Sequence, residues 1–149
     1  MFDFIKIGKV PKTSWSSEET FNLKPRLKTL MALVIGLILF GLGEALLVTS
    51  QLGVSPWTAL GQGLASVSEV SLGLTTFLIS VFVLFLWIPL KQKPGIGTIL
   101  NAIIISLVLH YAIPFLPVFQ ETFLRLIQAI LGVFITGIGG GIYLIANLG

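Results

Sequence analysis

The sequence predicts an all-α membrane protein with four spanning helices and one short additional helix. Its 149 residues are 55% hydrophobic and only 10% charged, with a mean hydropathy of +1.02, whereas soluble domains carry about 25% charged residues. The charges are also segregated, because six of the nine Lys and Arg residues lie within the first 28 positions. Long apolar blocks with basic flanks are typical of polytopic membrane proteins.

Residues 1–28 mix basic residues with Ser, Thr and Pro and show no sustained period. We expect a basic cytoplasmic tail here, with an interfacial turn at residues 2–7. Residues 30–50 follow as the first span, with Glu44 as their one charge. At about 1.5 Å per residue, this stretch is long enough for a hydrocarbon core of about 30 Å.

Three further spans are predicted, at residues 72–90, 96–115 and 123–148. The second closes on Lys91 and Lys93, which we expect on the cytoplasmic side together with the basic tail. Two crossings separate these basic clusters, which indicates a multi-pass protein of the bacterial inner membrane with a cytoplasmic N-terminus. Arg125 stands alone at the outer start of the fourth span, where its long side chain can reach the headgroups.

Residues 53–71 are too polar and too short to span, and they predict a short helix at 55–68. Ser55 suits the N-cap position, and Pro56 suits the first helical position because its missing N–H costs nothing there. Two interpretations are open. The helix lies in the outer interface with Trp57 as its anchor, or it is a half-helix that dips into the protein and presents its N–H groups to a ligand.

Residues 36–53 match residues 132–149 at an offset of 96, with five identities in 18 positions. The identities are Gly36/Gly132, Gly41/Gly137, Gly43/Gly139, Leu52/Leu148 and Gly53/Gly149, and Gln51/Asn147 is a conservative match. The two segments belong to spans of opposite direction, a pattern typical of the inverted repeats of secondary transporters. Since no second Ser-Pro start follows Gly149, we expect the chain to end inside its second repeat.

Glu44 is the first candidate for chemistry, about 9 Å from the outer end of its span. Gly41, Val48 and Gln51 share its helical face. A carboxylate at this depth is expected to face a cavity or a polar partner. It is either a binding group coupled to a proton or cation, or a structural group hydrogen-bonded to a neighbouring helix.

The third span carries Asn101 and His110 on different faces. His110 lies near the outer end, where a hydrated interfacial role competes with ligand binding. A lone His without a second ligand predicts no metal site, and no nucleophile–base set or nucleotide motif points to an enzyme or a cofactor. The glycines expected to pack helices, or to form a dimer, are Gly41, Gly43, Gly132, Gly137 and Gly140.

Two stretches, GLGEALLVTSQLGVSPWTALGQGLA and LWIPLKQKPGIGTILNAIIISLVLH, resemble the YczE/YitT-type family of bacterial integral membrane proteins. The resemblance covers roughly residues 30–149 and implies a polytopic, transporter-like or permease-like protein whose members are longer than this chain. The sequence departs from the family pattern at Thr58 and Gly61, where relatives often carry Asp and His. It departs again at Glu44, where relatives have a small residue.

We therefore predict a transporter for a small solute, with its site between the first and fourth spans near the start of the short helix. The expected binding residues are Glu44, Gln51, Ser55, Trp57, Gln62, Asn101 and His110. The alternative is a non-transporting membrane factor that packs against or regulates another membrane protein. Expected partners are the lipid bilayer and a solute, with no nucleic acid, and either a homodimer or a missing C-terminal repeat completes the assembly.

Overall fold

The computed structural model describes residues 13–149 as five α-helices and one 3₁₀ turn, with no strand among them. The elements are α1 (Leu27–Ser50), α2 (Pro56–Ser68), α3 (Leu72–Trp87), α4 (Ile96–Ala112), the turn Ile113–Phe115 and α5 (Thr122–Ile145). The all-α prediction is confirmed. The interfacial turn expected at residues 2–7 lies outside the described residues, as does the tail up to residue 12.

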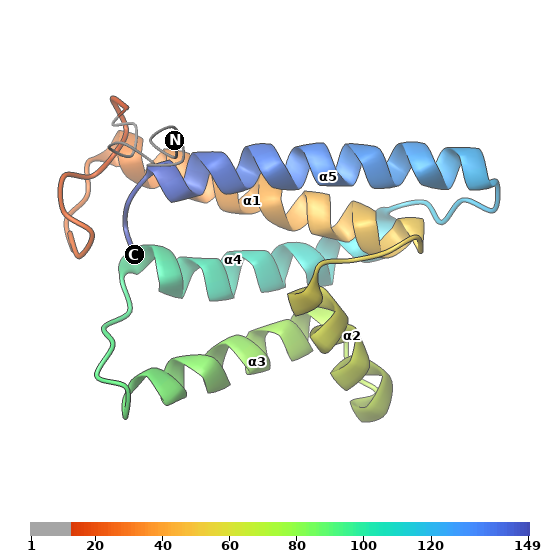
Figure 1. Ribbon diagram of the computed structural model, residues 1–149, viewed down its shortest axis with the longest axis horizontal. Coiled ribbons are helices and arrows are strands. Elements are labelled where there is room, and N and C mark those ends of the chain that lie inside the picture. Colours follow the sequence, from red (N-terminus) through yellow and green to blue (C-terminus); the bar gives the residue numbers. More distant parts are fainter. Residues whose placement is uncertain (1–12) are drawn as a thin grey trace, which may run out of the picture.

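Four helices lie side by side in the order α5, α1, α4, α3, and α2 crosses them near one end (Figure 1). Consecutive long helices run in opposite directions, so the ends of α1 and α5 that flank the tail and the C-terminus lie together (Figure 1). Three segments are long and apolar enough to cross a membrane: Leu27–Ser50, Ile96–Phe115 and Thr122–Ile145. The pair of α2 and α3, bent by 113°, is the fourth candidate.

α3 and α5 each end before the residue at which the sequence predicts the end of the span. α3 stops at Trp87, short of the predicted residue 90, because Pro89 has no N–H to continue the helical hydrogen bonds, although Ile88 before it still has helical backbone angles. Its 16 residues extend about 24 Å, less than a full hydrocarbon core. α5 stops at Ile145 rather than 148, and Asn147 beyond it adopts a left-handed conformation.

α1 and α5 touch backbone to backbone through two pairs of glycines. Gly36 faces Gly139, and Gly43 faces Gly132. A methyl group added at Gly36 would lie 2.7 Å from the Tyr143 nitrogen, and one at Gly132 would lie 3.0 Å from the Gly43 oxygen. Without side chains at these positions the helices approach closely, which is the usual basis of helix association in membranes.

The other predicted packing glycines differ in their surroundings. A methyl group at Gly41 would lie 2.9 Å from the Val108 side chain of α4, and one at Gly140 would make ordinary contact with the Phe40 ring. Nothing lies within 4 Å of a methyl group added at Gly137. Within the described chain, the packing glycine of that turn is therefore Gly139, because Gly137 faces outward.

Arg125, the isolated charge of α5, caps the end of α1. Its Nε donates to the Ser50 carbonyl and its Nη2 donates to the Gln51 carbonyl, each at 2.8 Å. The last carbonyls of a helix lack partners within the helix and carry its negative dipole end, so a cation is favourable there. The Arg125 side chain thus joins the first turn of α5 to the C-terminal end of α1.

We predict that Gly139→Ala destabilises the protein by about 1–3 kcal/mol, because the added methyl group would meet the α1 backbone at Phe40 and Gly36. Gly137→Ala is the matched control two residues away and should be neutral or slightly stabilising, since alanine favours the helix. Thermal unfolding of the two purified variants in detergent measures the difference. Equal stabilities would contradict the close α1–α5 contact.

Candidate functional site

The buried carboxylate of Glu44 is held by the first turn of α2. Ser55 is the N-cap of that helix and Pro56 its first residue, as the sequence predicts, and the Ser55 hydroxyl accepts a hydrogen bond from the Thr58 N–H at 3.3 Å. The Ser55 hydroxyl also donates a hydrogen bond to Glu44 Oε2 at 2.8 Å, and the Thr58 hydroxyl donates to the same oxygen. Glu44 itself is 2% exposed.

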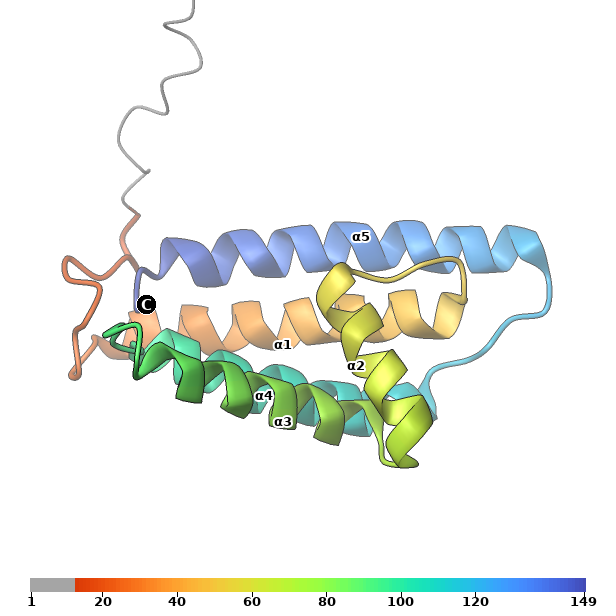
Figure 2. The same ribbon diagram turned by 60° about the horizontal axis from the view of Figure 1, so that its bottom comes forward.

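This contact fixes the depth at which α2 begins. Six residues separate Glu44 from the end of α1 at Ser50, so the first turn of α2 lies about 9 Å inside that end. Residues 51–55 turn back to bring it there, and α2 then crosses toward the start of α3 (Figure 2). The arrangement favours the half-helix interpretation, with the positive end of the α2 dipole beside a carboxylate.

A cavity of about 210 Å³, called here the central chamber, lies beside Glu44 and is bordered by all five helices. Its lining residues are Phe40, Glu44, Ser55, Trp57, Thr58, Thr76, Ser80, Asn101, Ile105, Leu109 and Tyr143. Glu44 is the one charged side chain among them. The chamber therefore combines a single carboxylate with hydroxyl, amide and aromatic groups.

One fully buried polar atom among the lining residues has no partner in the described part of the chain. Thr76 is 3% exposed, and its Oγ1 makes no hydrogen bond to any residue from 13 to 149. Buried hydroxyl groups are ordinarily satisfied, so Thr76 is an exception in the part of the chain that the structure describes, and its hydroxyl would reach a molecule in the chamber after a rotation of the side chain. The Ser80 hydroxyl, one turn further along α3, donates to the Thr76 carbonyl at 2.8 Å and keeps its acceptor capacity.

Aromatic rings form part of the chamber wall. Phe40 and Tyr143 pack edge to face, with ring centroids 5.8 Å apart. Trp57 is 43% exposed and lines both the chamber and a second hollow of about 120 Å³. The second hollow shares Ser80 and Asn101 with the chamber and extends along α3 and α4 to Trp87 and Thr98.

The structure brings together four of the seven predicted binding residues: Glu44, Ser55, Trp57 and Asn101. Gln51 lies exposed beyond the end of α1, where its carbonyl accepts the bond from Arg125. Gln62 is half-buried on α2 and does not line the chamber.

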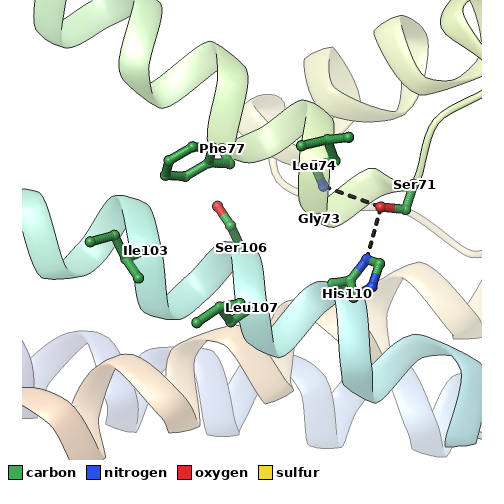
Figure 3. A pocket seen from close by; sticks show the side chains of 8 residues that line it. All are labelled: Ser71, Gly73, Leu74, Phe77, Ile103, Ser106, Leu107 and His110. Carbon is green, nitrogen blue, oxygen red and sulfur yellow. Dashed lines mark hydrogen bonds between the residues drawn. The ribbon is translucent and has the colours of Figure 1, made fainter.

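His110 lies in a different place, a groove of about 510 Å³ between α3 and α4 (Figure 3). Its Nδ1 is 2.9 Å from the hydroxyl of Ser71, the N-cap of α3. At the same level, a methyl group added at Gly73 would lie 2.5 Å from the Ser106 carbonyl of α4. His110 thus joins the start of α3 to α4, and the rest of the groove is largely apolar.

Sequence reasoning missed Thr58, Thr76, Phe40 and Tyr143. Thr58 carried a usable signal, because the third residue after an N-cap shares its side of the helix. Thr76 and Tyr143 carried none, since they reach the chamber only through the packing of α3 and α5. Among the described residues, no group of three or more His, Cys, Asp or Glu side chains could hold a metal ion.

We predict that Thr58→Val destabilises the protein by about 1–3 kcal/mol, because the buried Glu44 oxygen would lose a donor. Ser66→Ala is the control on the same helix, since that exposed hydroxyl donates only to the Gly63 carbonyl. Its effect should stay within about 0.5 kcal/mol. Chemical or thermal unfolding in detergent gives both values, and a Thr58 variant as stable as the Ser66 variant would contradict the contact.

Comparison with known proteins places the chain in a family. Residues 27–149 match the model of a family of unknown function, DUF6198. An uncharacterized protein of Haemophilus influenzae is 37% identical over 144 residues, which cover 97% of this chain and 65% of the relative. The uncharacterized membrane protein YczE of Bacillus subtilis is 29% identical over 116 residues, 76% of this chain and 54% of the relative.

The chain thus spans between about half and two thirds of the length of these curated relatives. No solved structure matches. The match to YczE agrees with the helices long and apolar enough to span a bilayer. This chain is a YczE-like membrane protein and belongs to the DUF6198 family.

Proposed function

We propose that the protein is a transporter for a small solute and that the central chamber is its binding site. The observation that carries the proposal is a buried carboxylate on the wall of a cavity to which all five helices contribute. Intramembrane carboxylates are costly and are typical of ion and substrate pathways. The second hollow, which continues from the chamber along α3 and α4, supports a path through the protein.

The short helix α2 supports the same proposal. Secondary transporters bind solutes near the membrane midplane, where discontinuous helices present their termini to the ligand. Here α2 and α3 are bent by 113°, and the N-terminus of α2 meets Glu44 within the bundle. Glu44 is then the group that binds a coupling proton or cation. Tyr143 on α5 is the other titratable side chain of the chamber.

We also propose that α1 and α5 are equivalent helices of an inverted repeat. The two helices are antiparallel. The 96-residue offset relates Gly36 to Gly132 and Gly43 to Gly139, so it converts the contact between Gly36 and Gly139 into the contact between Gly132 and Gly43. The residues that follow the helices also correspond in conformation. Gln51 and Asn147 have φ angles of 57° and 53°, and Gly53 and Gly149 both have positive φ.

One surface favours a second candidate, a membrane factor that binds another membrane protein. Gly137 and Gly141 face away from the bundle, and Phe134 and Ile138 on the same helix are exposed. Small residues at this spacing allow close packing of a partner helix. Reconstituted protein separates the candidates, because a transporter moves solute without a partner.

We predict that the tail and the α3–α4 loop face the cytoplasm of a bacterial inner membrane. The chain contains no Cys, so single cysteines can report topology directly. Gln92→Cys should resist a membrane-impermeant thiol reagent in intact spheroplasts, whereas Gln120→Cys in the α4–α5 connection should react. The reverse labelling would contradict the orientation.

We predict that Glu44→Gln abolishes the pH dependence of solute flux, because the amide keeps an acceptor for Ser55 and Thr58 but cannot bind a proton. Flux is measured in proteoliposomes with a panel of small cations, anions and neutral solutes at several pH values. Glu69→Gln is the control, since Glu69 is an exposed carboxylate outside the chamber. Unchanged pH dependence in the Glu44 variant would exclude the coupling role, and no flux of any solute would favour the membrane-factor candidate.

A further inference from the structure

We propose that the central chamber binds a small organic cation bearing N–H groups, an alkylammonium ion. The inference takes the chamber as the binding site, as the proposed function does, and adds the chemical class of its ligand. Three features of the chamber carry it: the charge of the site, its free acceptor atoms and its aromatic wall.

The charge comes from Glu44 alone. No Lys, Arg or His lines the chamber, and the bonds to the carboxylate come from two neutral hydroxyl groups. Both bonds end on Oε2, and no residue from 13 to 149 donates to Oε1. A buried carboxylate without a cation is costly, so a positively charged ligand gains most by taking the free oxygen.

The free acceptors match the donors of an ammonium group. An R–NH₃⁺ group has three N–H donors and no acceptor, as in lysine. Besides Glu44, the chamber is lined by Asn101, whose side chain carries an amide oxygen acceptor, and by Thr76, whose Oγ1 is buried without a partner among residues 13–149. After a rotation of its side chain, the Thr76 hydroxyl would accept a hydrogen bond from an ammonium ion, since no residue from 13 to 149 bonds to it.

The remaining wall favours the organic part of such an ion. Phe40, Trp57 and Tyr143 line the chamber, and the faces of aromatic rings attract cations and disfavour anions. The volume of about 210 Å³ lies below the roughly 300–1,000 Å³ of pockets that hold drug-sized ligands. The chamber therefore suits an ion with a few carbon atoms.

Trp57 provides a direct measure of binding. The full chain with Trp15→Phe and Trp87→Phe retains Trp57 as its one tryptophan. In detergent at neutral pH, its fluorescence is titrated with ethylammonium, ethanol and acetate, which are similar in size and differ in charge. We expect a saturable change with ethylammonium at a concentration at least about tenfold lower than for the other two, since bonds to charged groups are the stronger ones.

Variants locate the binding groups. Glu44→Gln should weaken ethylammonium binding by at least about tenfold, whereas Glu69→Gln should leave it unchanged. Thr76→Val should weaken ethylammonium several-fold and spare tetramethylammonium, which has no N–H group. Because the Thr76 hydroxyl has no hydrogen-bond partner among residues 13–149, its removal should not lower the unfolding temperature, so a folding defect does not obscure this test.

Equal responses to ethanol, acetate and ethylammonium would overturn the proposal, as would unchanged binding in Glu44→Gln. Sodium binding at tenfold lower concentration than ethylammonium would also overturn it, in favour of an inorganic cation. The binding and flux experiments distinguish a failure of the proposed ligand class from a failure of the proposed transport function. Amine binding without flux would retain the ligand class and exclude transport, whereas Glu44-dependent flux of anions or neutral solutes alone would retain transport and exclude the ligand class.

Discussion

The carboxylate of Glu44 accepts hydrogen bonds from the two hydroxyl groups in the first turn of α2, and this contact holds the short helix against α1. Without it, α2 would be joined to the bundle mainly through α3. The contact also determines the course of the chain, because residues 51–55 must turn back to bring Ser55 beside Glu44. The chamber exists where it does because α2 begins at this depth.

The second constraint is the close approach of α1 and α5. Their glycine pairs allow backbone contact, and Arg125 joins the start of α5 to the end of α1. This brings Tyr143 of α5 against Phe40 of α1, where the two rings form one side of the chamber. This pair of long helices thus forms one side of the chamber, and α2, α3 and α4 form the rest.

Sequence chemistry predicts the local features well. Ser55 and Pro56 identify the start of α2 through capping alone, and Glu44, the one acid of the first span, lines the central chamber. The partners from other helices could not be predicted, because Thr76 and Tyr143 become neighbours of Glu44 only through tertiary packing. Tertiary packing also explains why Gly139 packs against α1 and Gly137 does not. Both glycines belong to a ridge of small residues in the sequence, and the rotation of α5 about its axis determines which of them faces α1.

His110 lies apart from the other residues predicted to bind a ligand. A titratable side chain near the end of a span is a natural candidate for ligand binding, but the structure places its ring nitrogen beside the cap residue Ser71, in a groove away from the chamber. Asn101, on another face of the same helix, reaches the chamber. The spacing of Asn101 and His110 along α4 correctly predicted that they lie on different faces of the helix. It could not predict which of these faces packs against the other helices.

The most direct test of this account is an infrared difference spectrum of the purified protein between acidic and neutral pH, in the absence and presence of ethylammonium. The account predicts one carboxyl band that is missing in Glu44→Gln and retained in Glu69→Gln, and that ethylammonium suppresses at intermediate pH because cation and proton compete for the same oxygen. A spectrum identical in the Glu44 variant and the unsubstituted protein would contradict the claim that Glu44 is an ionisable group accessible from the chamber.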